Sequence, residues 1–308
     1  AATGINYYLS PDWSKLADPQ VWLAAYGQIF FSLSVGFGTM VAYSSFMPRD
    51  TELPNSAAIT SFANCAFSFM AGFAVFSVLG YFAFAANLPI EKVVKSGPGL
   101  AFVIYPAALA MLPFWVKFFA FLFFITLLAV GIDSAFSLLQ TVSAALSDKF
   151  DISRTKATTA VSVISFILGI PLATSAGLFW LDIIDHFIMS YLITTAVIME
   201  CIAVGWILKS KVFIKEVNRT AEIRLGKSFS FMIKFFTPSI LIVIIVLSFI
   251  KEIQKPYEGY PISAILILGV GFIVLTIIAS IILSSVKNKN TEQKEEEVRR
   301  ANKMEEVV

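Results

Sequence analysis

Seven long apolar runs limit what this chain can fold into. Each run is long enough to cross about 30 Å of hydrocarbon as a helix. Hydrophobic residues make up 57% of the 308 residues and the mean hydropathy is +0.80, which is unusual for a soluble domain. Only helices and closed barrels satisfy their backbone in lipid, so we predict an all-α membrane protein with about seven transmembrane helices. The predicted spans lie near 19–46, 56–86, 113–146, 157–174, 177–207, 229–251 and 262–286.

Basic residues predict how the chain is oriented. Lysine and arginine are retained in cytoplasmic loops, and here they gather in 147–156, 209–227 and the tail 287–308. We therefore predict a multi-pass protein of the cell membrane with its C terminus in the cytoplasm. Segment 87–112, whose first half is too polar to span, is predicted to be a re-entrant external cap. The formal net charge of +2 reflects this topology, and we expect no nucleic-acid partner.

The start of the chain and its cysteines allow two further expectations. An outside amino terminus normally follows a signal peptide or an earlier span, but the chain begins at Ala1 without methionine or an apolar leader. We expect a sequence that is incomplete at its N-terminal side. Cys65 and Cys201 both fall within predicted spans and give no metal-ligand spacing. Without a recognisable nucleophile–base pair either, we predict that the protein is not an enzyme.

The first predicted span is interrupted at residues 28–38, QIFFSLSVGFG. Non-helical backbone at membrane depth persists only where it is buried in protein or lines a cavity, so the interruption indicates a transporter binding site. A half-helix over 20–31 would end in carbonyls that suit a cation, and one over 37–46 would begin with amides that suit an anion. Ser32 and Ser34 would add hydroxyl oxygens there. The alternative is an ordinary glycine kink.

Asp133, followed by Ser134, lies inside the apolar span 113–146. A charged side chain at the centre of a membrane helix costs roughly 2.5–3.5 kcal/mol on insertion scales, so a functional role is expected. A carboxylate beside a hydroxyl offers hard oxygen ligands and one negative charge, which suit a small cation such as sodium. Two alternatives remain, a structural aspartate bonded to another helix and a proton carrier.

Other polar residues give weaker signals. Asn64 and Ser68 lie one turn apart on a predicted helix and offer neutral donors and acceptors, although small polar residues also bridge membrane helices. The carboxylates near predicted helix ends, and the one histidine, fit solvated or interfacial positions. These residues are Asp148, Asp182, Asp185 and His186.

Four sequence segments together resemble the neurotransmitter:sodium symporter family, which has a twelve-helix inverted-repeat fold with broken helices. QIFFSLSVGFG is similar to the sixth helix of the family and NCAFSFMAGFAVFSVLGY to the seventh. SGPGLAFVIYP resembles external loop 4, and GIDSAFSLLQ resembles the eighth helix. The resemblance covers residues 1–308 and corresponds to the family from external loop 3 to the C terminus. It implies that the first five helices belong to a missing N-terminal part of the same protein.

The resemblance implies roles for particular residues. It implies one or two sodium ions, and chloride as a further ion that a carboxylate in the missing part could replace. For sodium it implies Ser32 and Asn64 at one site, and the Val130 carbonyl, Asp133 and Ser134 at the other. For substrate it implies Phe31, Ser34, Phe37 and Ala135, and for chloride Gln28, Ser32, Asn64 and Ser68. Asp185 and Asp148 would be the acidic halves of the external and cytoplasmic gates.

Phe46 departs from the family, because many relatives carry a gate tyrosine there. The departure puts the inner gate network in doubt. As a whole, the resemblance implies sodium-coupled symport of a small amino acid or related amine by alternating access. The alternatives are a seven-span receptor, an ion channel and a proton-coupled transporter.

Overall fold

The computed structural model describes residues 1–48, 50–94 and 97–286, so the predicted tail 287–308 lies outside the described residues. Every regular element in these residues is a helix, which confirms the predicted all-α class. The chain forms two compact units, which we describe separately. The first consists of Ala1–Trp22, Asp50–Ser134 and Lys209–Ser230, and the second of Leu23–Arg49, Ala135–Leu208 and the chain from Phe231 onward.

Five helical stretches in the described residues are long and apolar enough to cross a membrane. They correspond to five of the seven predicted spans, and they are Leu53–Ala85, Val116–Phe150, Gly177–Ile207, Lys227–Gly259 and Ile262–Ser285. The predicted span 157–174 forms α9 (Arg154–Gly169) and the short η3 (Pro171–Ala173). The predicted span 19–46 forms α2 (Pro19–Ser32) and α3 (Thr39–Ser44), so the first span is discontinuous as predicted.

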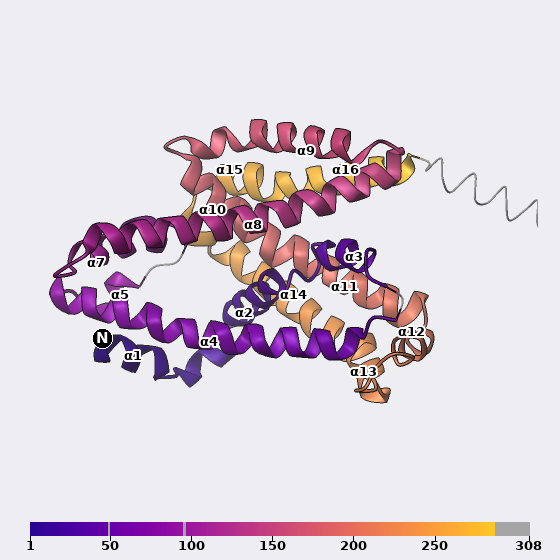
Figure 1. Cartoon of the computed structure of the whole chain (residues 1–308), viewed down its shortest axis with the longest axis horizontal. Coiled ribbons are helices and arrows are strands. Elements are labelled where there is room, and N and C mark those ends of the chain that lie inside the picture. The colour runs from indigo at the N-terminus through magenta and orange to yellow at the C-terminus, as the bar shows by residue number, and fades with distance from the viewer. Residues whose placement is uncertain (49, 95–96, 287–308) are drawn as a thin grey trace, which may run out of the picture. The chain divides into compact units, whose positions relative to one another are not determined.

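In the first unit, α1 (Ala2–Leu9) lies along α4 (Leu53–Ala85), as Figure 1 shows. Glycine allows the close approach, because a Cβ on Gly4 would lie 1.8 Å from the Phe76 carbonyl oxygen. The Tyr8 ring stacks on Phe76 with centroids 4.8 Å apart. Small residues at a helix crossing let two backbones pack directly, which stabilises membrane helices in the absence of a hydrophobic driving force.

The predicted cap 87–112 forms short helices at the C-terminal end of α4. Its N-terminal part is α5 (Ile90–Val93), and its apolar part is α6 (Gly97–Gly99), η2 (Leu100–Ile104) and α7 (Tyr105–Ala110). Buried side chains of the cap and of α4 form one core cluster, composed of Leu79, Ala83, Ile90, Val93 and Ile104. The cap is thus fastened to α4 by apolar packing, whereas its depth in the membrane stays a prediction.

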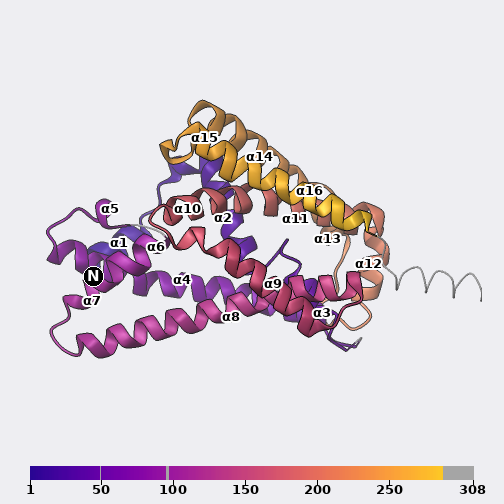
Figure 2. The same cartoon turned by 90° about the horizontal axis from the view of Figure 1, so that it is seen from above.

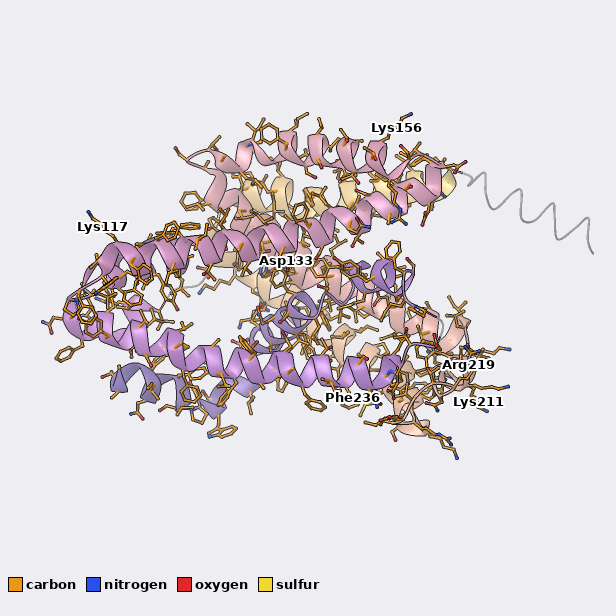
Figure 3. The ribbon with its side chains drawn as sticks, viewed as in Figure 1. Lys117, Asp133, Lys156, Lys211, Arg219 and Phe236 are labelled. Atoms are coloured by element: carbon orange, nitrogen blue, oxygen red, sulfur yellow. The ribbon has the colours of Figure 1, made fainter. Side chains whose placement is uncertain are left out.

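The basic segment 209–227 contacts the start of α4. It contains α12 (Ser210–Val217) and leads into α13 (Lys227–Phe231). The Asn55 side chain donates to Glu222 Oε2 at 3.2 Å and accepts from the Ile223 amide at 3.1 Å. Lys211 and Arg219 of this segment are marked in Figure 3.

The second unit is built around a core of apolar side chains from α2, η4 (Ile188–Ile193), α11 (Thr194–Ile202) and α14 (Thr237–Gln254). Figure 2 labels α2, α11 and α14. The buried members of this core are Phe30, Ile193, Val197, Ile198 and Leu241. The remaining elements are α10 (Gly177–Phe187), η5 (Ala203–Ile207), η6 (Met232–Phe236), η7 (Tyr257–Gly259), α15 (Ile262–Ala264), η8 (Ile265–Val270) and α16 (Gly271–Ser285). One long helix, α8 (Val116–Phe150), runs from the first unit into the second.

Candidate ion and substrate site

The break in the first predicted span comprises residues 33–38. Helix α2 ends in a Schellman motif, in which the residue after the helix takes the left-handed conformation and two amides turn back to the last carbonyls. Ser34 has that conformation, with φ of +54°. The Val35 amide donates to the Phe30 carbonyl at 2.8 Å, and the Ser34 amide donates to the Phe31 carbonyl at 3.1 Å. The break is therefore an ordered helix end.

This geometry modifies the expectation that both helix ends at the break are available to ions. The carbonyls of Phe30 and Phe31 already accept hydrogen bonds from the turn. Helix α3 has six residues, so few aligned peptide dipoles stand behind its amide end. Ions at the break would therefore be bound by side chains and the turn backbone more than by helix dipoles.

Two glycines in the break have backbone conformations that other residues rarely adopt, Gly36 with φ of +80° and Gly38 with φ of +73°. A Cβ on Gly36 would lie 3.0 Å from Val197 Cγ2 and 3.2 Å from the Ile193 carbonyl oxygen. Glycine at this position satisfies both the left-handed conformation and the close contact with α11.

The aromatic residues that flank the break have different environments. Phe37, together with Val35, packs against the core cluster of the second unit. Phe31 is 55% exposed and meets the Phe37 ring edge-on, with centroids 6.2 Å apart. Ser32 and Ser34 are half-buried. The structure thus brings the predicted substrate residues Phe31, Ser34 and Phe37 together at one turn.

Helix α3 is fastened to the second half of α8 by hydroxyl groups. The Tyr43 phenol donates to Ser137 Oγ at 3.0 Å, and the hydroxyl groups of Thr141 and the buried Thr39 form a hydrogen bond at 3.3 Å. Thr39 follows the last glycine of the break directly. These contacts fix the position of the second half-helix within its unit.

Phe46, where many relatives carry a tyrosine, has a cationic partner. The Arg154 guanidinium, at the start of α9, lies over the Phe46 ring, 4.7 Å from its centroid. A phenyl ring retains the face that attracts a cation although it has no hydroxyl. The chain after α3 therefore contacts α9 through the Phe46 ring, without a tyrosine hydroxyl.

Asp133 is the central residue of α8 and is labelled in Figure 3. The helix has 35 residues and is about 52 Å long at 1.5 Å per residue, so Asp133 lies far from either end. Asp133, Ser134 and Ala135 are exposed, and Val130, which is 60% exposed, precedes Asp133 by three residues on the same helix face. The predicted second sodium site is therefore a set of oxygen donors at the middle of a long apolar helix.

The other predicted ion ligands lie in pairs, each pair on one helix. Asn64 and Ser68 lie one turn apart on α4, as Gln28 and Ser32 do on α2. Asn64 belongs to the first unit and Ser32 to the second, so the first sodium site and the chloride site stay predictions. The predicted gate residues, Asp185 on α10 and Asp148 near the end of α8, are exposed.

One polar cluster was missed by the sequence reasoning, which gave His186 an interfacial position without a partner. In the structure the His186 ring contacts the Glu252 carboxylate. These residues are 66 positions apart, and no sequence pattern connects them. The only signal was that a histidine followed two aspartates at the start of a membrane helix.

Comparisons with known proteins agree with the resemblance. The model of the sodium:neurotransmitter symporter family matches residues 1–291. An uncharacterized sodium-dependent transporter of Methanocaldococcus jannaschii is 42% identical over 287 residues, which cover 93% of this chain and 58% of the relative. The sodium-dependent dopamine transporter of Caenorhabditis elegans is 35% identical, over 83% of this chain and 42% of the relative. The sodium- and chloride-dependent glycine transporter 2 of Xenopus laevis is 35% identical, over 84% of this chain and 33% of the relative. The chain spans about half the length of the curated relatives that it matches.

Proposed function

The chain belongs to the sodium:neurotransmitter symporter family, and we propose that the protein moves a small amino acid or related amine together with sodium by alternating access. Members of this family are transporters, not enzymes. The names of the relatives describe them as sodium-dependent transporters, and two of these names give dopamine and glycine as the substrates. The sodium gradient would supply the free energy for substrate accumulation.

The observation that carries this proposal is the ordered break between α2 and α3. In a continuous helix the backbone groups away from the ends already have partners within the helix, whereas this turn presents left-handed backbone at Ser34, Gly36 and Gly38. Its folding uses conformations that cost about 1–3 kcal/mol at a non-glycine residue. A break that is packed so closely against the core of its unit supports a binding role over a simple kink.

Sodium would bind at two places in the proposed mechanism. The Val130 carbonyl, the Asp133 carboxylate and the Ser134 hydroxyl would bind one ion on α8, and Ser32 and Asn64 would contribute to the other. Hard oxygen ligands suit an ion of this kind. Binding to α8 would also compensate the cost of the Asp133 charge at membrane depth.

The substrate would bind beside the break, near Phe31, Ser34, Phe37 and Ala135. The Ser34 hydroxyl would donate a hydrogen bond, and the exposed Phe31 ring would cover an apolar part of the substrate. The small side chain of Ala135 leaves space for a larger substrate group. A sodium ion nearby would neutralise a substrate carboxylate.

Chloride and the gates complete the proposal. Gln28, Ser32, Asn64 and Ser68 would provide neutral donors to chloride, which the glycine transporter relative requires by its name. Asp185 would close the external side and Asp148 the cytoplasmic side through arginine partners elsewhere in the protein. The basic segment 209–227 would lie in the cytoplasm, as would the C terminus.

Uptake into proteoliposomes tests the proposal. The full-length protein is given mixed labelled amino acids and amines under an inward sodium gradient, and under potassium at equal ionic strength. We expect accumulation with sodium only. Accumulation driven by a proton gradient instead would make Asp133 a proton carrier, and currents far above the substrate flux would indicate a channel. No accumulation with either gradient would favour a receptor.

A further inference from the structure

A cluster of hydrogen-bonding side chains at one end of α10 is not used by the proposed transport mechanism. It links α10 and η4 to α14 and to the connection that follows it. Its members are Asp182, His186, Tyr191, Glu252, Tyr257 and Tyr260. All six belong to the second unit.

The centre of the cluster is the pair His186 and Glu252, whose side chains are only 11% and 12% exposed. His186 Nε2 contacts Glu252 Oε1, and the Tyr191 phenol donates to Glu252 Oε2 at 2.6 Å. A carboxylate that is largely removed from water is costly unless it is paired or hydrogen-bonded. Glu252 therefore meets two donors, one on each oxygen.

The second partner of His186 is an aromatic ring. Tyr257, in η7, stacks on the imidazole with centroids 3.7 Å apart and an interplanar angle of 12°. A protonated imidazole over such a face gains a cation–π attraction that the neutral ring lacks. The stack, like the pair with Glu252, is therefore stronger when His186 carries a positive charge.

Asp182, one turn before His186 on α10, ties the same connection to the helix. It accepts from the Tyr260 phenol at 2.9 Å and from the Tyr257 phenol at 3.4 Å. Partial burial and the hydrogen bond to Asp182 raise the pKa of Tyr260 to about 12, so this phenol keeps its proton at neutral pH. While the imidazole is neutral, the six side chains of the cluster therefore include two carboxylates, Asp182 and Glu252, and no positively charged group.

We propose that His186 and Glu252 form a proton-binding site, and that proton uptake there tightens the link between α10, α14 and η7. A carboxylate can only accept, so in the neutral ring the hydrogen stays on Nε2 toward Glu252 and the added proton goes to Nδ1. Histidine is the side chain whose ordinary titration falls between about pH 5 and 8.

The charged groups on the surrounding elements favour an additional positive charge. Besides Asp182 and His186, α10 carries Asp185, the predicted external gate residue. Besides Glu252, α14, η7 and the residues that connect them carry Lys251, Lys255 and Glu258. The elements η3, α15 and η8 carry no charged residue. These elements thus carry four carboxylates and two lysines besides His186. The new charge appears beside Asp185.

Thermal unfolding of the full-length protein tests the proposal without measuring transport. Stability gained by a partner of the protonated ring is complete at low pH and is lost as the pH rises past the histidine titration. We expect Glu252→Gln to lower the melting temperature more at about pH 5.5 than at about pH 8. The expected difference is about 2–4 °C, and it should vanish in the His186→Gln background.

Tyr191→Phe is the matched control, because it removes a donor to Glu252 but no group that titrates in this range. Because the carboxylate that pairs with His186 remains, its effect on the melting temperature should change less between the two pH values than that of Glu252→Gln. A Glu252→Gln effect that is the same at both pH values would overturn the proposal. If a variant does not fold, histidine NMR of the unmodified protein decides. The His186 imidazole signal, the chain's one histidine, must shift between the two pH values, and an unchanged signal would refute the site.

Discussion

At the scale of single residues, Ser34 and Gly36 determine the backbone conformation of the break between α2 and α3. Ser34 occupies the left-handed position of the Schellman motif, where glycine is the usual residue. Gly36 occupies a left-handed position that also touches α11. The same turn therefore contains one position where a side chain is retained at a conformational cost and one where no side chain fits. This difference leads to two opposite predictions.

Gly36→Ala should lower stability. The new Cβ would have a left-handed backbone and a 3.0 Å contact with Val197, so we expect a loss of about 1–3 kcal/mol together with reduced transport. Melting temperature and uptake measure the two effects. Gly27→Ala in α2 is the matched control, because nothing lies within 4 Å of its Cβ. A Gly36→Ala variant as stable as this control would contradict the assigned geometry.

Ser34→Gly should raise stability by about 1 kcal/mol, because glycine adopts the left-handed conformation without the Cβ penalty. If the Ser34 hydroxyl binds substrate, the same variant should raise the substrate KM. Thermal unfolding and uptake kinetics would thus move in opposite directions. A variant that is both more stable and unchanged in KM would remove Ser34 from the proposed substrate site.

At the scale of elements, α3 depends on α8 for its position. Its six residues leave most of its backbone groups at the two helix ends without an intrahelical partner, so contacts with other elements determine its position. Tyr43 and Thr39 connect it to Ser137 and Thr141, and Arg154 lies over Phe46 just after it. The part of α8 that follows Asp133 thus holds the second half of the break.

Tyr43→Phe tests this attachment, because it removes one hydrogen bond and keeps the ring. We expect a loss of about 0.5–1.5 kcal/mol in stability and faster hydrogen exchange in residues 39–44. Tyr81→Phe in α4 serves as a control, since that phenol makes only a long bond of 3.4 Å to the Met111 carbonyl. Unchanged exchange in α3 would mean that apolar packing alone positions it.

Elements with a local signal could be predicted from the sequence, and contacts between distant residues could not. The glycines and serines of QIFFSLSVGFG predicted the break, because their conformational effect is local. The 16-residue length of α9 and the hydrogen bonds of the Schellman motif could not be predicted, because they depend on the folded backbone. Two contacts arise from tertiary packing, the pair of His186 with Glu252 and that of the Arg154 guanidinium with the Phe46 ring. No periodic pattern in a single sequence predicts such contacts between distant residues.

At the scale of the whole molecule, the proposed transport depends on a carboxylate at the centre of a long apolar helix. Asp133 is exposed on α8, and its charge at membrane depth is costly unless other groups compensate it. In the proposed mechanism, sodium binding would compensate this charge and would couple the ion gradient to the conformation of the protein.

The most direct test is the sodium activation of uptake by Asp133→Asn in the full-length protein. The amide keeps the size and one carbonyl oxygen but removes the charge, so we expect the sodium concentration for half-maximal uptake to rise at least about tenfold, equivalent to 1.4 kcal/mol. Glu91→Gln, an exposed carboxyl in the cap, is the control and should behave as the unmodified protein does. Sodium activation that is unchanged in Asp133→Asn would contradict the central claim.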